Sequence, residues 1–130
     1  MGVLGIAMST AACQVLGFAW YGPLFGSVWV RNCGRRKEDI DRYGNSRWIM
    51  LVPALSKIGS SIIIGHVLKD HLGVTTLPDA CKNGLALSVI IALYSACHSP
   101  FIGEGLPSYL VNAGYDAVCT VLTAVLVTRY

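Results

Sequence analysis

The sequence predicts an all-α fold, an integral membrane bundle of four transmembrane helices, and three observations support this. First, 54% of the 130 residues are hydrophobic and 13% are charged, whereas a soluble domain is about one-quarter charged. Second, the charged residues cluster at 31–47, at 69–82 and near 104. Third, the apolar stretches between these clusters reach the roughly 20 residues that a helix needs to cross a bilayer.

Four stretches have this length, and together they predict a single transmembrane domain over residues 1–130. The predicted spans are 2–22, 49–68, 83–102 and 106–128, and a basic loop covers 31–48. Lys57 and Asp116 are the only charged residues inside these spans. The first span lacks the basic leader of a secretory signal, so we expect it to be a permanent membrane helix.

The first span runs into an unusual string, FAWYGPLFGSVWV at residues 18–30, which combines five aromatic residues with Gly-Pro. Residues 2–30 carry no charge, and as one helix they would be roughly 43 Å long, more than the hydrocarbon thickness. We therefore predict a break at Gly22-Pro23, with residues 24–30 lying along the membrane interface. The alternative is one long tilted helix with a proline kink. The predicted interface motif comprises Trp20, Tyr21, Gly22, Pro23, Phe25 and Trp29, with the polar atoms of Trp20 and Tyr21 at the headgroup level.

The distribution of lysine and arginine predicts the orientation of the chain. Six of these residues lie in the basic loop and three lie on the other side of the predicted spans. The excess favours a cytoplasmic loop, or a matrix-facing loop in a mitochondrion. Such a loop can also contact anionic lipid headgroups. The mitochondrial inner membrane is the favoured location, with a bacterial or plasma membrane as the alternatives.

Small and polar residues recur every four positions in each span, which predicts close helix packing. The stripes are Gly5, Ser9, Cys13 and Gly17 in the first span, Lys57, Ser61 and Gly65 in the second, Gly84, Ser88, Ala92 and Ala96 in the third, and Asn112, Asp116, Thr120 and Ala124 in the fourth.

A structural cluster of intramembrane polar residues is predicted from Lys57, Asp116, Asn112, Gln14 and His98. Because the second and fourth spans run parallel, Lys57 and Asp116 come to similar depths, and pairing would relieve the penalty of each isolated charge. The sequence therefore predicts an ion pair between them. A proton or ligand site, and a Lys57 side chain that reaches the interface or another subunit, remain alternatives.

Several classes of function are disfavoured by the motifs that the chain lacks. The three histidines do not have the spacing of a zinc site, and no nucleophile elbow or phosphate-binding loop occurs. The five cysteines form no Cys-x-x-Cys pair. We therefore expect no catalysis, no metal and no cofactor, and the mixed charges of the basic loop argue against binding to nucleic acid.

Two strings, WYGPLFGSVW after the first span and YLVNAGYDAV in the last, resemble the signature stretches of a family of small membrane proteins, domain of unknown function 1761. The resemblance extends over nearly the whole chain and implies the four-span fold, but the family has no established activity. Two functions stay open. The favoured one is an accessory or scaffold subunit of a larger membrane complex, of respiratory-chain or ATP synthase type, with other subunits and lipids as partners. The alternative is a small homo-oligomeric transporter or ligand-binding protein that uses Lys57, Asp116, Asn112 and His98.

Overall fold

The computed structural model describes residues 2–130, and nearly all of them are helical, with no strand in that range. The α-helices are α1 (Val3–Ala19), α2 (Gly26–Asn32), α3 (Lys37–Gly44), α4 (Leu51–Gly65), α5 (Leu77–His98) and α6 (Leu106–Arg129). Shorter turns adjoin them: η1 (Trp20–Leu24), η2 (Arg47–Met50), η3 (His66–His71) and η4 (Ser99–Ile102). The predicted all-α fold is confirmed.

Four helical segments are long and apolar enough to cross a membrane, as predicted. They are Val3–Leu24, Arg47–His71, Leu77–Ile102 and Leu106–Arg129. The third begins six residues before its predicted start at 83, because Thr76 caps the helix by accepting a hydrogen bond from the Asp79 backbone N–H at 3.3 Å. The chain is thus built as a multi-pass integral membrane protein.

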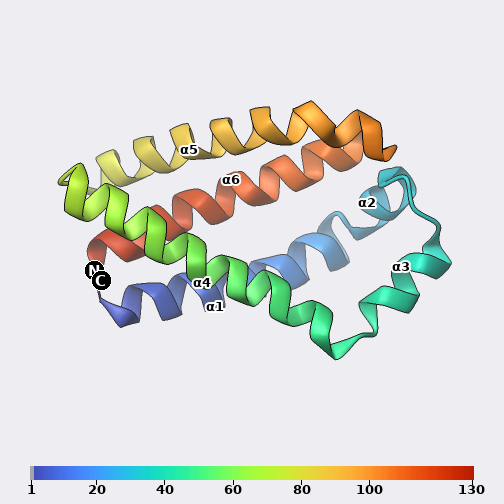
Figure 1. The fold of residues 1–130 in the computed structure, drawn as a ribbon, viewed down its shortest axis with the longest axis horizontal. Helices are drawn as coiled ribbons and strands as arrows, with labels where there is room; N and C mark the ends of the chain where they lie inside the picture. Colours follow the sequence, from blue (N-terminus) through green and yellow to red (C-terminus); the bar gives the residue numbers. More distant parts are fainter. Residues whose placement is uncertain (1) are drawn as a thin grey trace.

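The four segments run antiparallel along the chain, so α4 and α6 point in the same direction and both termini lie at one end of the bundle (Figure 1). The other end carries α2, the basic loop and the η4 turn. We call the end with the termini the terminal end and the opposite end the basic-loop end. Helix α6 is central, because α1, α2, α4 and α5 all pack against it. Helix α5, in contrast, packs extensively only against α6.

Small residues form the contacts between helices, as the four-residue spacing predicts. On α1, Gly5, Ser9 and Cys13 are buried, and the Ser9 hydroxyl is 2.7 Å from the hydroxyl of Ser61 on α4. On α5, Gly84 lies so close to α6 that an added Cβ would be 2.8 Å from the Val121 Cα. The backbones therefore approach one another directly, as is usual where lipid supplies no hydrophobic driving force.

The predicted break at Gly22-Pro23 is confirmed, and the single long helix is wrong. Gly22 has non-helical dihedral angles, φ −104° and ψ −105°, and α2 starts only at Gly26. Pro23 has no backbone N–H to continue the helix. Helix α2 packs against α6 at the basic-loop end. The position of residues 24–30 at a membrane interface stays a prediction.

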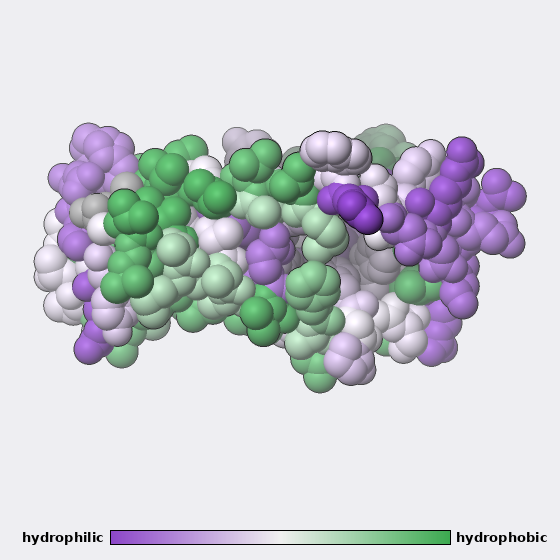
Figure 2. Space-filling model, turned by 90° about the horizontal axis from the view of Figure 1, so that it is seen from below, coloured by the Kyte–Doolittle hydropathy of each residue, from purple (hydrophilic) through white to green (hydrophobic). Residues whose placement is uncertain are grey.

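The basic loop contains a helix of its own, α3, where the sequence predicts only a loop. Arg36 pairs with Asp39 at 3.5 Å at the start of this exposed helix. Figure 2 shows apolar residues over the middle of the molecule and hydrophilic residues at both ends. This distribution is that of a protein whose central belt lies in lipid.

Candidate functional site

The two signature stretches, far apart in the sequence, meet at the basic-loop end of the bundle. The Trp20 indole Nε1 donates a hydrogen bond of 2.9 Å to the Val111 carbonyl oxygen of α6. The Tyr21 hydroxyl donates one of 2.6 Å to Asn112 Oδ1. Both polar atoms are thus used to attach η1 to α6, and the position of the two rings at the headgroup level stays a prediction.

The remaining rings of the first stretch also pack within the protein. Phe25 lies against Trp20 with ring centroids 4.8 Å apart, and Trp29 lies edge-on to Tyr21 at 5.7 Å. Tyr21 in turn contacts Tyr115 of α6 at 5.3 Å. The turn at Gly22 and Pro23 brings these rings back onto the end of α1. The aromatic motif therefore packs inside the protein and attaches the end of the first span to α6.

Glu104, which the sequence analysis did not single out, is the centre of a hydrogen-bond network. Its Oε1 accepts from the Ser108 hydroxyl at 2.9 Å and from the Asn112 side-chain amide at 2.5 Å. Its Oε2 accepts from the Ser99 hydroxyl at 2.5 Å. Through Asn112 the network continues to Tyr21. The spacing of 104, 108 and 112, four residues each, is the signal that could have revealed it.

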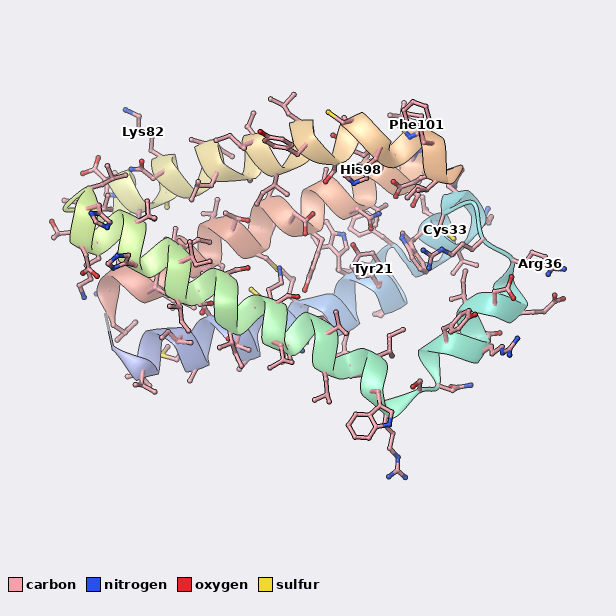
Figure 3. All side chains as sticks on the ribbon, in the orientation of Figure 1. Tyr21, Cys33, Arg36, Lys82, His98 and Phe101 are labelled. Atoms are coloured by element: carbon pink, nitrogen blue, oxygen red, sulfur yellow. The ribbon has the colours of Figure 1, made fainter. Side chains whose placement is uncertain are left out.

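A polar cavity of about 330 Å³ lies beside this network, between η1, the end of α5 and the first half of α6. In Figure 3, His98 lies on the side of α5 that faces α6, and Tyr21 approaches the same space from η1. The residues that line the cavity are Tyr21, Ser95, His98, Ser99, Ile102, Glu104, Tyr109, Asn112, Ala113, Tyr115 and Asp116. Three of the five residues predicted as a polar cluster, His98, Asn112 and Asp116, are thus brought together here.

Asp116 is the acidic residue of the predicted polar cluster. Its side chain is half-buried and lines the cavity, and among residues 2–130 its carboxylate has neither a hydrogen-bond donor nor an ion-pair partner. Only its backbone carbonyl is used, accepting from the Thr120 hydroxyl at 2.6 Å. A carboxylate within a span and without a protein partner is costly to keep.

The predicted ion pair between Lys57 and Asp116 is not formed. Arg36–Asp39 and His66–Asp70 are the ion pairs that the described residues make. The Lys57 ammonium instead lies 5.1 Å from the centre of the Tyr115 ring. Adjacent residues of a helix point about 100° apart. Tyr115 thus contacts Lys57, whereas the neighbouring side chain of Asp116 lines the cavity at the end of α5.

Gln14, the last member of the predicted cluster, lies in a second cavity of about 470 Å³ between α1 and α4. This cavity is lined by Gln14, Gly17, Phe18, Tyr21, Gly22, Met50, Pro53 and Tyr115. Tyr21 and Tyr115 line both cavities. The Tyr115 hydroxyl donates to the Cys13 carbonyl oxygen at 2.9 Å, which fixes this ring between the two spaces.

The cavities contain no cluster with the donor set of a metal site. In the part of the chain that the structure describes, no group of three or more histidine, cysteine or acidic residues is placed to hold a metal ion. The cysteines at 13, 33, 81, 97 and 119 are all free. The chemistry offered by the first cavity is that of carboxylates, tyrosine rings and one imidazole.

Comparison with known proteins gives one match. Residues 4–128 match the model of the family described as "Protein of unknown function (DUF1761)". No curated protein and no solved structure matches the chain.

Proposed function

We propose that this chain, which belongs to the DUF1761 family, is a non-catalytic membrane protein that binds a small cation in the cavity beside Asp116, as a binding protein or as a homo-oligomeric transporter. The observation that carries the proposal is the Asp116 carboxylate, which lines that cavity within a span and has no protein partner among residues 2–130. An ionisable residue kept in a span is most often functional.

The lining favours a cation over an anion. Glu104 and Asp116 supply two carboxylates, and Lys57, whose ammonium lies over the Tyr115 ring, does not line the cavity. The tyrosine rings provide faces that attract an ammonium or guanidinium group. Because Glu104 already accepts three hydrogen bonds, Asp116 is the carboxylate left to pair with a ligand.

The volume limits the size of the ligand. A cavity of about 330 Å³ is at the lower end of the range for small-molecule pockets. It suits a compact organic cation or a partly hydrated inorganic cation. His98 and Ser95, on the α5 side, provide further polar contacts.

Transport is the form of this proposal that the second cavity supports. The two cavities meet at Tyr21 and Tyr115, so a movement of these rings would join them. A chain of 130 residues encloses little volume alone, and a homo-oligomer would complete the path across the membrane.

The test is ligand binding by the purified chain in mild detergent. Chloride salts of sodium, potassium, guanidinium, tetramethylammonium and ethanolammonium are titrated. Binding is followed by tryptophan fluorescence, because the Trp20 ring centroid lies 6.4 Å from that of Tyr115, which lines the cavity. We expect at least one cation to bind, and Asp116→Asn to weaken it by about tenfold or more, as for a lost charge-assisted contact.

The matched control is Glu38→Gln, the same carboxylate-to-amide change on the exposed surface of α3, which should leave affinity unchanged. Equal binding by wild type and Asp116→Asn would contradict the proposal. If a cation binds, its flux into proteoliposomes distinguishes a transporter from a binding protein.

The accessory or scaffold subunit is a second candidate, and α5 favours it. This helix packs extensively only against α6 and exposes Leu85, Val89, Leu93 and Tyr94 along its outer side. Another subunit or lipid would cover that side. The version predicted from the sequence places the protein in a respiratory-chain or ATP synthase complex of the mitochondrial inner membrane. Migration of the native protein in mild detergent tests it: a stoichiometric large complex supports the subunit, and a small homo-oligomer supports the transporter.

A further inference from the structure

We propose that His66 and His71, at the terminal end of the bundle, form a binding site for a divalent transition-metal ion that prefers imidazole nitrogen, such as Cu²⁺ or Zn²⁺. The Nε2 atoms of the two rings lie 3.0 Å apart, and His66 Nδ1 lies 2.8 Å from Asp70 Oδ2. The site is far from the cation cavity and independent of it.

The local backbone explains why these two rings meet. Residues five apart on an α-helix point about 140° away from each other, so the sequence spacing alone argues against a shared site. From His66 to His71, however, the chain forms a wider π turn, in which the Leu72 N–H bonds to the Val67 carbonyl oxygen at 3.0 Å. This turn brings the two imidazoles to one side, and π turns are frequent at functional sites.

Asp70 sets the state of the His66 ring. An ionised carboxylate only accepts hydrogen bonds. In the neutral ring, His66 Nδ1 therefore carries the proton and donates a hydrogen bond to Asp70. The lone pair of His66 is then on Nε2, which faces His71. A carboxylate behind an imidazole is the usual support of a metal-binding histidine. With the His71 proton on its Nδ1, both Nε2 lone pairs are available to one ion.

The distance between the nitrogens fits a shared ion. Two imidazole nitrogens, each about 2.0–2.1 Å from a metal, lie about 2.9 Å apart at a right angle and about 3.4 Å apart in a tetrahedron. The observed 3.0 Å is within this range. Both rings are exposed, so the ion has direct access from water, and water completes its coordination.

The test is a Cu²⁺ titration of the purified chain in detergent, after removal of any polyhistidine tag. Calorimetry should show one site, and electron paramagnetic resonance should show coordination by two nitrogens. His66→Ala and His71→Ala should each weaken binding by about tenfold or more. Asp70→Asn should weaken it by about 10–100-fold. Zn²⁺ should compete for the same site.

His98→Ala is the control for the number of histidines, because it removes the third one and leaves the pair intact. It should retain the affinity of the wild type. Equal Cu²⁺ affinity for wild type, His66→Ala and His71→Ala would overturn the proposal, and so would a spectrum with a single coordinated nitrogen. The exposed positions of both rings let these variants fold, which thermal melting without metal verifies.

Discussion

The two ends of the bundle are held together in different ways. At the terminal end the helices approach through glycine and other small residues, and Gly5 and Gly84 lie directly against the backbone of α6. At the basic-loop end they are joined by side-chain hydrogen bonds from Tyr21, Asn112 and Glu104. The terminal end has a cavity of about 190 Å³, whereas the hydrogen-bonded groups of the basic-loop end adjoin two larger cavities of about 330 and 470 Å³.

This difference separates stability from function along the length of one small protein. Close backbone contact holds the terminal end, where the buried polar groups are small hydroxyls such as those of Ser9, Ser61 and Thr128. The basic-loop end keeps two carboxylates, and three hydrogen bonds stabilise that of Glu104. The Asp116 carboxylate has no protein partner among residues 2–130. Under the proposed function, Asp116 lowers the stability of the bundle and provides the binding site for the cation.

The largest expected effect is that of Glu104→Ala. The change leaves the Ser99 and Ser108 hydroxyls and the Asn112 amide without their acceptor. We expect a loss of about 3 kcal/mol or more in the free energy of unfolding, because unsatisfied donors cost about 1–3 kcal/mol each. Unfolding in increasing dodecyl sulfate measures it. Hydrogen exchange should rise in α2 and at the start of α6 but not in α5 near Gly84. Uniform opening would show that the two ends are not separate.

Gly84→Ala tests the terminal end and should have the next largest effect. The new Cβ would lie 2.8 Å from the Val121 Cα and 3.1 Å from the Ala124 Cβ, and such overpacking costs about 1–3 kcal/mol. Gly59→Ala is the matched control, since an added Cβ there meets no atom within 4 Å. Thermal melting compares the two. A normal melting temperature for Gly84→Ala would show that backbone contact does not hold this end.

Asp116→Asn should change stability in the opposite direction. It removes a charge that has no protein partner in the described chain while keeping the shape of the side chain. We expect the apo protein to gain about 1 kcal/mol, a fraction of the 2.5–3.5 kcal/mol insertion cost because the carboxylate is only half-buried. Melting of the protein without added cation measures it. A clear loss of stability would mean that Asp116 is structural.

Tyr21→Phe should give the smallest change. It removes one hydrogen bond to Asn112 and keeps the ring contacts, and single side-chain hydrogen bonds in membrane bundles contribute about 0.6 kcal/mol on average. Tyr94→Phe, on the exposed side of α5, provides the control and should have no effect. A loss as large as that of Glu104→Ala would show that the whole network depends on this hydroxyl.

Hydropathy and backbone chemistry were sufficient to predict the fold. The four spans follow from the length of the apolar stretches, the break from Gly22-Pro23, and the packing faces from residues such as Gly5 and Gly84. These features depend on properties that each segment has by itself, which explains why they could be read from the sequence.

The site depended on how the helices are rotated relative to one another. The sequence predicts similar depths for Lys57 and Asp116, but in the structure the Lys57 ammonium lies over the Tyr115 ring while Asp116 lines the cavity at the end of α5. Glu104 lies in a connection between spans and acquires its role only when the start of α6 folds over it. The His66–His71 contact likewise requires a π turn that the spacing does not reveal.

The central place of α6 has a consequence for biosynthesis. The other three spans leave the ribosome before α6, yet α1, α4 and α5 all take it as a packing partner. Helices α1 and α4 can already pair through Ser9 and Ser61. Until α6 enters the membrane, however, Trp20 and Tyr21 lack the acceptors that they use in the finished bundle, and α5 lacks its main packing partner. Assembly is therefore completed only with the fourth span, and a chain that stops short of it exposes to the quality-control machinery polar groups that the complete protein conceals.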